Sequence, residues 1–195
     1  MAPVDISCRF RWVDCQLGYL CRCLPGRIQR ALGELPEMLN GTYECTLRDL
    51  DKANWEFAHQ LLQFVAVASR PLRVEELVQF LGFDFMTGLV LKFQQDWLLE
   101  DPIDGMLSTM SSLLATVDLN GSQVIQFSHF SVKEFLTSSR LAEARDIFVQ
   151  CYYISMTEAH TFATQACIGM LLHLDKNITI DGLDKFPLAK YAVEH

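Results

Sequence analysis

Histidine, cysteine and acidic side chains are scattered along this chain of 195 residues, and their spacing forms no catalytic motif. Nucleophilic catalysis needs a nucleophile with a base and an orienting group, and no such set can be recognised. The seven cysteines are odd in number and lack the paired spacing of a disulfide framework. Cys21 and Cys23 stand two residues apart, which directs them to different sides of a helix and argues against a zinc site. We therefore expect reduced thiols, no metal, no catalytic residues and no enzyme activity from this chain alone.

One histidine, His129, is placed where an anion could bind. It follows a segment with the character of a strand and comes two residues before Ser131, at which we expect a helix to begin. The backbone N–H groups and the dipole of a helix N-terminus favour an anion at such a position. The alternative is that His129 satisfies only a local hydrogen bond.

The segment before His129 has the signals of a β-hairpin. Asn120 and Gly121 form the dipeptide that suits a type I′ turn, because both residues tolerate positive φ. Val117 and Val124 should then face each other across the turn. The returning strand should run over residues 124–128.

Two local patterns mark the start of the helix after His129. Ser131 and Glu134 have the Ser-x-x-Glu spacing of a capping box, and Phe130 and Phe135 have the spacing of a hydrophobic staple. We therefore expect Ser131 to be the N-cap of this helix.

Three helices are expected before the hairpin. Apolar residues at helical spacing predict helices over residues 54–68 and Val74–Leu81. Asp101 is a good N-cap and Pro102 suits the first helical position, so a third helix should begin there, and its apolar stripe continues to Leu114. Three helices, a hairpin and a further helix, in this order, predict a winged helix.

Helical segments flank the winged helix on both sides. An opening helix is predicted by a stripe of apolar residues at helical spacing, namely Phe10, Val13, Leu17, Leu20 and Leu24. We expect a helical subdomain over residues 1–52, the winged helix over residues 53–141 and a helical region over residues 142–195. The fold class is therefore mainly α with a small β-hairpin. The last region is expected to be the truncated start of a longer helical array.

Composition limits the broad class of the protein. Half of the residues are apolar, which is enough to fill a core and argues against disorder. There is no secretory signal and no apolar run long enough to span a membrane, so we expect a soluble, cytoplasmic protein. The net charge of −8 lies in residues 51–195, because residues 1–50 hold equal numbers of basic and acidic side chains. An acidic body argues against nucleic acid and membranes as partners.

A DNA-binding winged-helix protein is the main alternative from another functional class. Such binding needs Lys or Arg on the recognition helix and the wing, to neutralise phosphates and read bases. Residues 102–126, which should include both elements, contain no Lys, Arg or His. We therefore prefer an interaction role to DNA binding.

Four segments of the chain resemble one protein family. The segment 127–136 (FSHFSVKEFL), preceded by the segment 70–77 (RPLRVEEL), resembles the winged-helix region of fungal NACHT proteins, which belong to the STAND class of signalling ATPases. The segments 10–17 (FRWVDCQL) and 35–39 (LPEML), with Tyr43 after them, resemble the helical lid before that region. The likeness covers nearly the whole chain, and the order of the segments is more specific than any single motif.

The resemblance implies a regulatory and interaction module of an NLR-like signalling protein. In that family an effector region and a P-loop ATPase core precede the lid and the winged helix, and ankyrin repeats often follow them. This chain has no Gly-x-x-x-x-Gly-Lys-Ser/Thr sequence, so no cofactor is expected for it alone, and ADP or ATP would bind only in the full-length context. The implied partners are the ATPase core and the repeat domains, with self-association as a further option.

The resemblance also gives His129 a specific role. In related STAND proteins a histidine between the hairpin and the helix, often within a Met-His-Asp triplet, contacts the β-phosphate of ADP and keeps the protein closed. Here the triplet is Ser128-His129-Phe130, so the histidine matches and the acidic residue does not. The likeness therefore implies that His129 senses nucleotide when the ATPase core is present.

Overall fold

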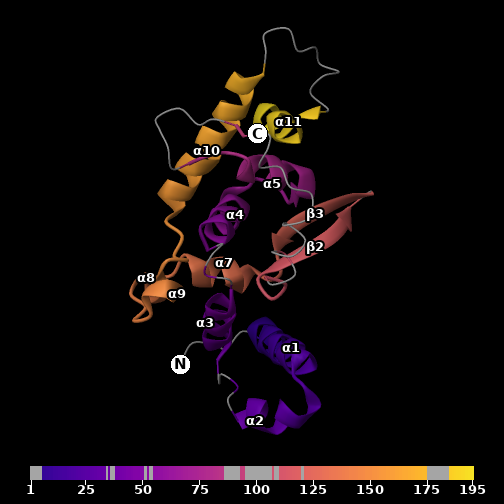
Figure 1. The fold of residues 1–195 in the computed structure, drawn as a ribbon, viewed down its shortest axis with the longest axis vertical. Coiled ribbons are helices and arrows are strands. Elements are labelled where there is room, and N and C mark those ends of the chain that lie inside the picture. Colours follow the sequence, from indigo (N-terminus) through magenta and orange to yellow (C-terminus); the bar gives the residue numbers. More distant parts are fainter. Residues whose placement is uncertain are drawn as a thin grey trace.

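The computed structural model describes residues 6–33, 35, 38–50, 52, 55–85, 93–94, 107, 110–119, 121–174 and 185–195. These residues form an elongated, mainly helical molecule with one small antiparallel sheet near its middle (Figure 1). The first helices occupy one end of the molecule, and the last two helices occupy the other. The predicted fold class is confirmed.

The N-terminal helices are α1 (Ile6–Arg22), α2 (Ile28–Gly33) and α3 (Leu39–Asp49). Helix α1 packs on α3 through Cys15 and Gln16, which are both buried. The Gln16 amide donates a hydrogen bond of 2.7 Å to the Thr42 hydroxyl of α3. Much of the predicted apolar stripe of α1 lies outside this contact, since Phe10 and Leu17 are 73% and 57% exposed.

The middle of the molecule is formed by α4 (Trp55–Val67), β1 (Leu72–Arg73), α5 (Val74–Leu81), β2 (Leu114–Leu119) and β3 (Ser122–Phe127). Strand β3 lies between β1 and β2 and pairs antiparallel with both. Helix α5 has the bounds that the apolar spacing predicts. A helix, a short strand, a further helix and then a hairpin that completes the sheet are the arrangement of a winged helix.

The hairpin of β2 and β3 has the predicted register. Val117 pairs directly with Val124. Gly121 has a φ of 80°, the left-handed conformation that the turn requires and that glycine adopts without strain. The Asp118 carboxylate accepts the N–H of Gly121 at 3.0 Å, which fixes the turn further. The returning strand ends at Phe127, one residue before the expected end.

The third helix before the hairpin does not reach Leu114 as expected. Its predicted start at Asp101 and Pro102 lies outside the described residues. The chain has already left the helix at Met110, where the N–H groups of Leu113 and Leu114 both bond to the Met110 carbonyl in a tight turn. Leu114 then opens β2. Met110 and Leu113 are fully buried in this turn, so the apolar spacing continues although the helix does not.

The helix after the hairpin, α7 (Phe130–Leu136), begins differently from the prediction. Its N-cap is His129, whose side chain accepts the N–H of Ser131, so the predicted capping box with Ser131 as N-cap is wrong. Ser131 is a buried residue within the first turn. The predicted staple is also wrong, because Phe130 is 51% exposed while Phe135 lies in the core.

The remaining helices are α8 (Ser139–Ala142), α9 (Ile147–Gln150), α10 (Met156–His173) and α11 (Pro187–Glu194). Helix α10 packs along α4, and α11 packs on α5 and α10. The contacts are largely aromatic: Phe64 of α4 stacks on Phe80 of α5 with centroids 4.2 Å apart and meets the edge of Tyr191 of α11 at 5.8 Å. One apolar cluster runs from α1 to α11. Within the described part of the chain, no helix is both long and apolar enough to cross a membrane.

Candidate functional site

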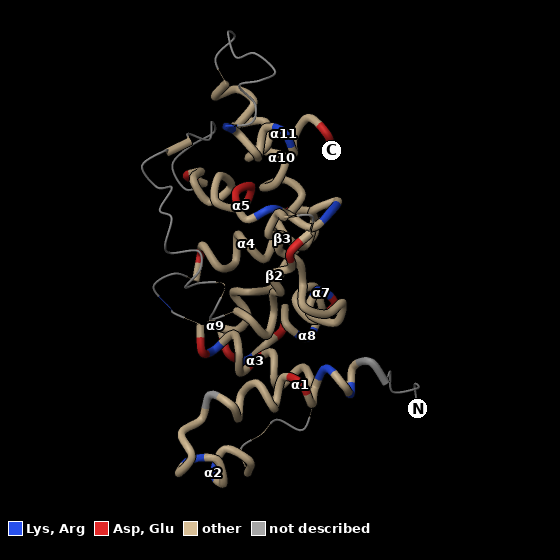
Figure 2. The backbone as a smooth tube through the Cα atoms, turned by 90° about the vertical axis from the view of Figure 1, so that its right-hand side faces the viewer, with Lys and Arg blue, Asp and Glu red and all other residues tan. Residues whose placement is uncertain are grey.

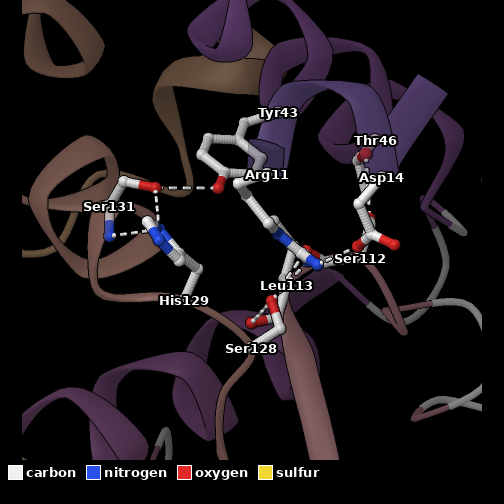
Figure 3. Close-up of polar contacts among 9 residues, drawn as sticks. All are labelled: Arg11, Asp14, Tyr43, Thr46, Ser112, Leu113, Ser128, His129 and Ser131. Atoms are coloured by element: carbon white, nitrogen blue, oxygen red, sulfur yellow. Dashed lines mark hydrogen bonds and ion pairs between the residues drawn. The ribbon is translucent and has the colours of Figure 1, made fainter. Parts of the chain in front are cut away.

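Polar contacts between the N-terminal helices and the winged helix gather around His129 (Figure 3). We call this group the seam, and it consists of Arg11, Tyr43 and Thr46 on one side and Ser112, Ser128, His129 and Ser131 on the other. Ser112 lies in the turn before β2, and Ser128 lies directly after β3. The seam therefore surrounds the open end of the hairpin, where β2 begins and β3 ends.

His129 caps α7 from an extended backbone conformation, with φ of −158° and ψ of 149°. Its Nδ1 accepts the N–H of Ser131 at 3.3 Å and lies 2.7 Å from the Ser131 hydroxyl oxygen. The imidazole also packs on the ring of Phe130, with centroids 4.2 Å apart. His129 thus makes the local hydrogen bond that was the alternative to a binding role. Its role in nucleotide sensing stays a prediction.

Tyr43 reaches the seam from α3. Its ring is fully buried and packs against Phe135 with centroids 5.4 Å apart, and its hydroxyl lies 3.0 Å from the Ser131 hydroxyl. Burial raises the pKa of Tyr43 above its ordinary value, although the hydrogen bond to Ser131 and the nearby Arg11 act in the opposite direction. The phenol therefore stays protonated at neutral pH and can donate a hydrogen bond.

Arg11 links α1 to the residues just before β2 and just after β3. Its Nη2 donates to the Ser112 carbonyl at 2.5 Å and to the Ser128 hydroxyl at 2.6 Å. Its Nη1 pairs with Asp14, one turn further along α1, at 2.6 Å. Hydrogen bonds from a charged donor are stronger than neutral ones. A single guanidinium thus holds both ends of the hairpin.

Two ion pairs lie between α3 and the segment of α8 and α9. Arg48 pairs with Asp146 at 2.9 Å, and Arg140 pairs with Glu44 at 3.0 Å. All four side chains are partly exposed, so solvent screens both pairs and each stabilises the contact only weakly. The buried contacts of the seam therefore contribute more to the stability of this interface than the two exposed ion pairs do.

The seam is suited to recognition and positioning. It offers a guanidinium, an imidazole and several hydroxyls, which are donors that bind carbonyl or phosphate oxygens. Among the residues that the structure describes, no group of three or more His, Cys, Asp or Glu side chains could hold a metal ion. None of the seven cysteines, all within the described residues, forms a disulfide, and burial raises the pKa of Cys167 to about 11, which keeps that thiol protonated.

Sequence reasoning found His129 but not the residues that hold it. The local pattern predicts Ser131 to be an N-cap, and Tyr43 stands out in the sequence only as part of the lid-like segment. Arg11 and Ser128 are 117 residues apart, and Tyr43 and Ser131 are 88 residues apart, so no local pattern could connect them. These contacts form only in the folded chain, so the sequence alone does not reveal them.

The comparison with protein families agrees with the topology of the middle of the molecule. Residues 51–147 match the family model for the winged-helix domain of GPI inositol-deacylase. A winged-helix domain is therefore present in this chain, as its strand order also indicates.

A curated fungal relative extends the likeness beyond that domain. The chain is 28% identical over 171 residues to the azaphilone pigments biosynthesis cluster protein L of Monascus ruber. The match covers 84% of this chain and 35% of the relative, so the chain spans about a third of that protein's length. No solved structure matches the chain significantly.

Proposed function

We propose that this chain is the regulatory and interaction module of a NACHT-type signalling ATPase of the STAND class, and that it helps to hold the nucleotide-bound, closed state. The ATPase core supplies the P-loop, and this module catalyses nothing by itself. Two findings support the proposal: a winged-helix domain follows a helical subdomain, and the fungal relative is much longer than this chain.

An exposed apolar surface on the N-terminal helices carries the proposal. We call it the N-terminal apolar face, and its members are Phe10, Val13, Leu17, Leu24, Leu32 and Met38. Four of these six side chains are more than 55% exposed. A gathering of large apolar side chains on a surface typically marks a contact with another protein segment. In the proposed full-length protein the ATPase core precedes α1, and we assign this face to the core.

The charge around this face indicates which surface of the core would fit. Residues 6–33 contain five Arg and one Asp, and Figure 2 shows basic positions along α1 and α2. Arg9, Arg27 and Arg30 are exposed beside the apolar residues. A complementary surface would be apolar at its centre and acidic at its rim.

The contact can be tested with the ATPase core of the parent gene produced as a separate polypeptide. Leu17→Asp places a charge among the exposed apolar side chains of α1 and should weaken association at least about tenfold in isothermal titration. Ile147→Asp is the matched control, because Ile147 is 75% exposed but lies on α9. Equal affinities for Leu17→Asp and the unchanged chain would refute the assignment of this face.

A further inference from the structure

A chain of hydrogen bonds joins α3 to His129 through Ser131 (Figure 3). The Tyr43 hydroxyl lies 3.0 Å from the Ser131 hydroxyl, which lies 2.7 Å from His129 Nδ1. Tyr43 belongs to the N-terminal helices, whereas Ser131 and His129 belong to the winged helix. The relay therefore crosses from one part of the molecule to the other.

The positions of the protons along this relay follow from its two ends. At one end the buried Tyr43 phenol stays protonated and has Arg11, a pure donor, beside it, so Tyr43 donates its own proton to the Ser131 oxygen. At the other end Nδ1 of His129 accepts the Ser131 N–H. The hydroxyl proton of Ser131 is then directed to the same nitrogen.

These bonds decide which nitrogen of His129 carries the proton. A neutral imidazole has one N–H and one acceptor nitrogen, and the hydrogen bond at one nitrogen fixes the state of the other. Because Nδ1 accepts from Ser131, the proton of the neutral ring is on Nε2. The neutral ring of His129 therefore carries its N–H group at Nε2, which is the tautomer that can donate from Nε2 to an acceptor oxygen.

The relay depends on how α3 lies against α7. Tyr43 is 0% exposed, and its ring rests on Phe135 of α7 at 5.4 Å between centroids. Moving α3 away from α7 would break the contact of Tyr43 with Ser131, after which the Ser131 hydroxyl could also accept from a protonated Nδ1. The tautomer of His129 is thus coupled to the closure of the seam.

We propose that Tyr43 and the Ser131 hydroxyl are positioning residues that strengthen the preference of His129 for its Nε2–H tautomer while α3 is docked on α7, beyond the preference set by the Ser131 backbone N–H. The relevance of this tautomer to a nucleotide phosphate rests on the proposed function. The control of the tautomer itself does not, and it can be measured in this chain alone.

The test is the ¹⁵N spectrum of the histidine rings in the 195-residue chain, with the His129 signals assigned by their loss in His129→Gln. The unchanged chain should show a single Nε2–H tautomer. Tyr43→Phe keeps the buried ring and removes the hydroxyl, so we expect a mixture of tautomers and exchange of the Ser131 amide about five- to tenfold faster. A purely structural role of Tyr43 in packing would not move the ring spectrum, because phenylalanine preserves that packing.

Two further variants complete the test. Ser131→Ala removes the middle hydroxyl but keeps the backbone N–H, and it should also reduce the preference for Nε2–H. Tyr153→Phe is the matched control, because Tyr153 is not a member of the seam and contacts His59 through its carbonyl, so it should leave the His129 signals unchanged. If both Tyr43→Phe and Ser131→Ala fold and retain the single Nε2–H tautomer, the relay proposal is overturned.

The relay and the proposed function are tested by different measurements, so that one can be refuted without the other. Suppose that Tyr43→Phe changes the tautomer of His129 but His129→Ala leaves ADP retention by the full-length protein unchanged. The relay is then supported and the nucleotide role is refuted. Suppose instead that ADP retention depends on His129 but Tyr43→Phe and Ser131→Ala leave its tautomer unchanged. The nucleotide role is then supported and the relay is refuted.

Discussion

His129 uses one ring nitrogen for the architecture of α7, since Nδ1 caps the helix. With the ATPase core restored, His129→Ala should reduce the ADP that remains bound after gel filtration and increase self-association measured by light scattering. The proposed reason is the loss of a phosphate contact that favours the closed state. His129→Asn retains a capping side chain and therefore separates this effect from a weakened helix. Unchanged ADP content and mass in both variants would remove His129 from the nucleotide site.

Glu76 is a second residue whose role can be measured, here in stability. It is 1% exposed, and it accepts two hydrogen bonds from Arg70, at 2.7 and 2.9 Å, and one from the N–H of Arg73. Glu76→Gln removes the charge that neutralises Arg70, so the free energy of unfolding should fall by about 2 kcal/mol. Urea denaturation would measure this change. Glu75→Gln, at an exposed neighbouring position, should change it by less than about 0.5 kcal/mol, and an equally small effect of Glu76→Gln would contradict the prediction.

At the level of elements, the hairpin and α5 could be predicted because their signals are local. Asn120 and Gly121 specify a tight turn, which sets the pairing of Val117 with Val124. Apolar spacing was sufficient to predict the bounds of α5.

The incorrect predictions concern residues whose partners are distant or whose spacing is ambiguous. The Ser-x-x-Glu pattern indicated Ser131 as a cap, but its hydroxyl contacts Tyr43, 88 residues away, and His129 caps the helix instead. The apolar spacing through Leu114 fits a helix and also fits the buried turn at Met110. Periodicity records which residues are buried, and it does not record the backbone conformation that buries them.

One buried amide adds hydrogen bonds to the aromatic contacts that dock α11. Gln79 of α5 accepts the N–H of Leu188 at 2.9 Å and donates to the carbonyl of Lys185 at 3.1 Å. Gln79→Ala removes both bonds and should accelerate hydrogen exchange and proteolysis in α11, with a local loss of about 1–2 kcal/mol. Gln165→Ala, at an exposed position of α10, is the matched control. Identical exchange of α11 in the two variants would show that its aromatic contacts alone are sufficient.

For the whole molecule, the distribution of charge predicts how the chain behaves toward DNA. The hairpin over residues 114–127 has no Lys, Arg or His, and residues 51–195 carry the whole net charge of −8. Because phosphate neutralisation dominates DNA affinity, we expect no salt-sensitive binding of duplex DNA even at about 50 mM salt, measured by fluorescence anisotropy. Binding that weakens steeply as salt is added would restore the DNA-binding alternative.

The two ends of the molecule are joined to its middle by different chemistry, and temperature therefore acts on them differently. Helices α10 and α11 are held largely by aromatic burial around Phe64, Phe80 and Tyr191, whereas the buried contacts of Arg11 and Tyr43 at the opposite end include several hydrogen bonds. Apolar burial weakens on cooling because its driving force near room temperature is entropic. Hydrogen bonds do not share that dependence. Chilling should therefore loosen the C-terminal helices before it loosens the contact between α3 and α7, and a cold sample would retain its hydrogen-bonded end while its aromatic end begins to open.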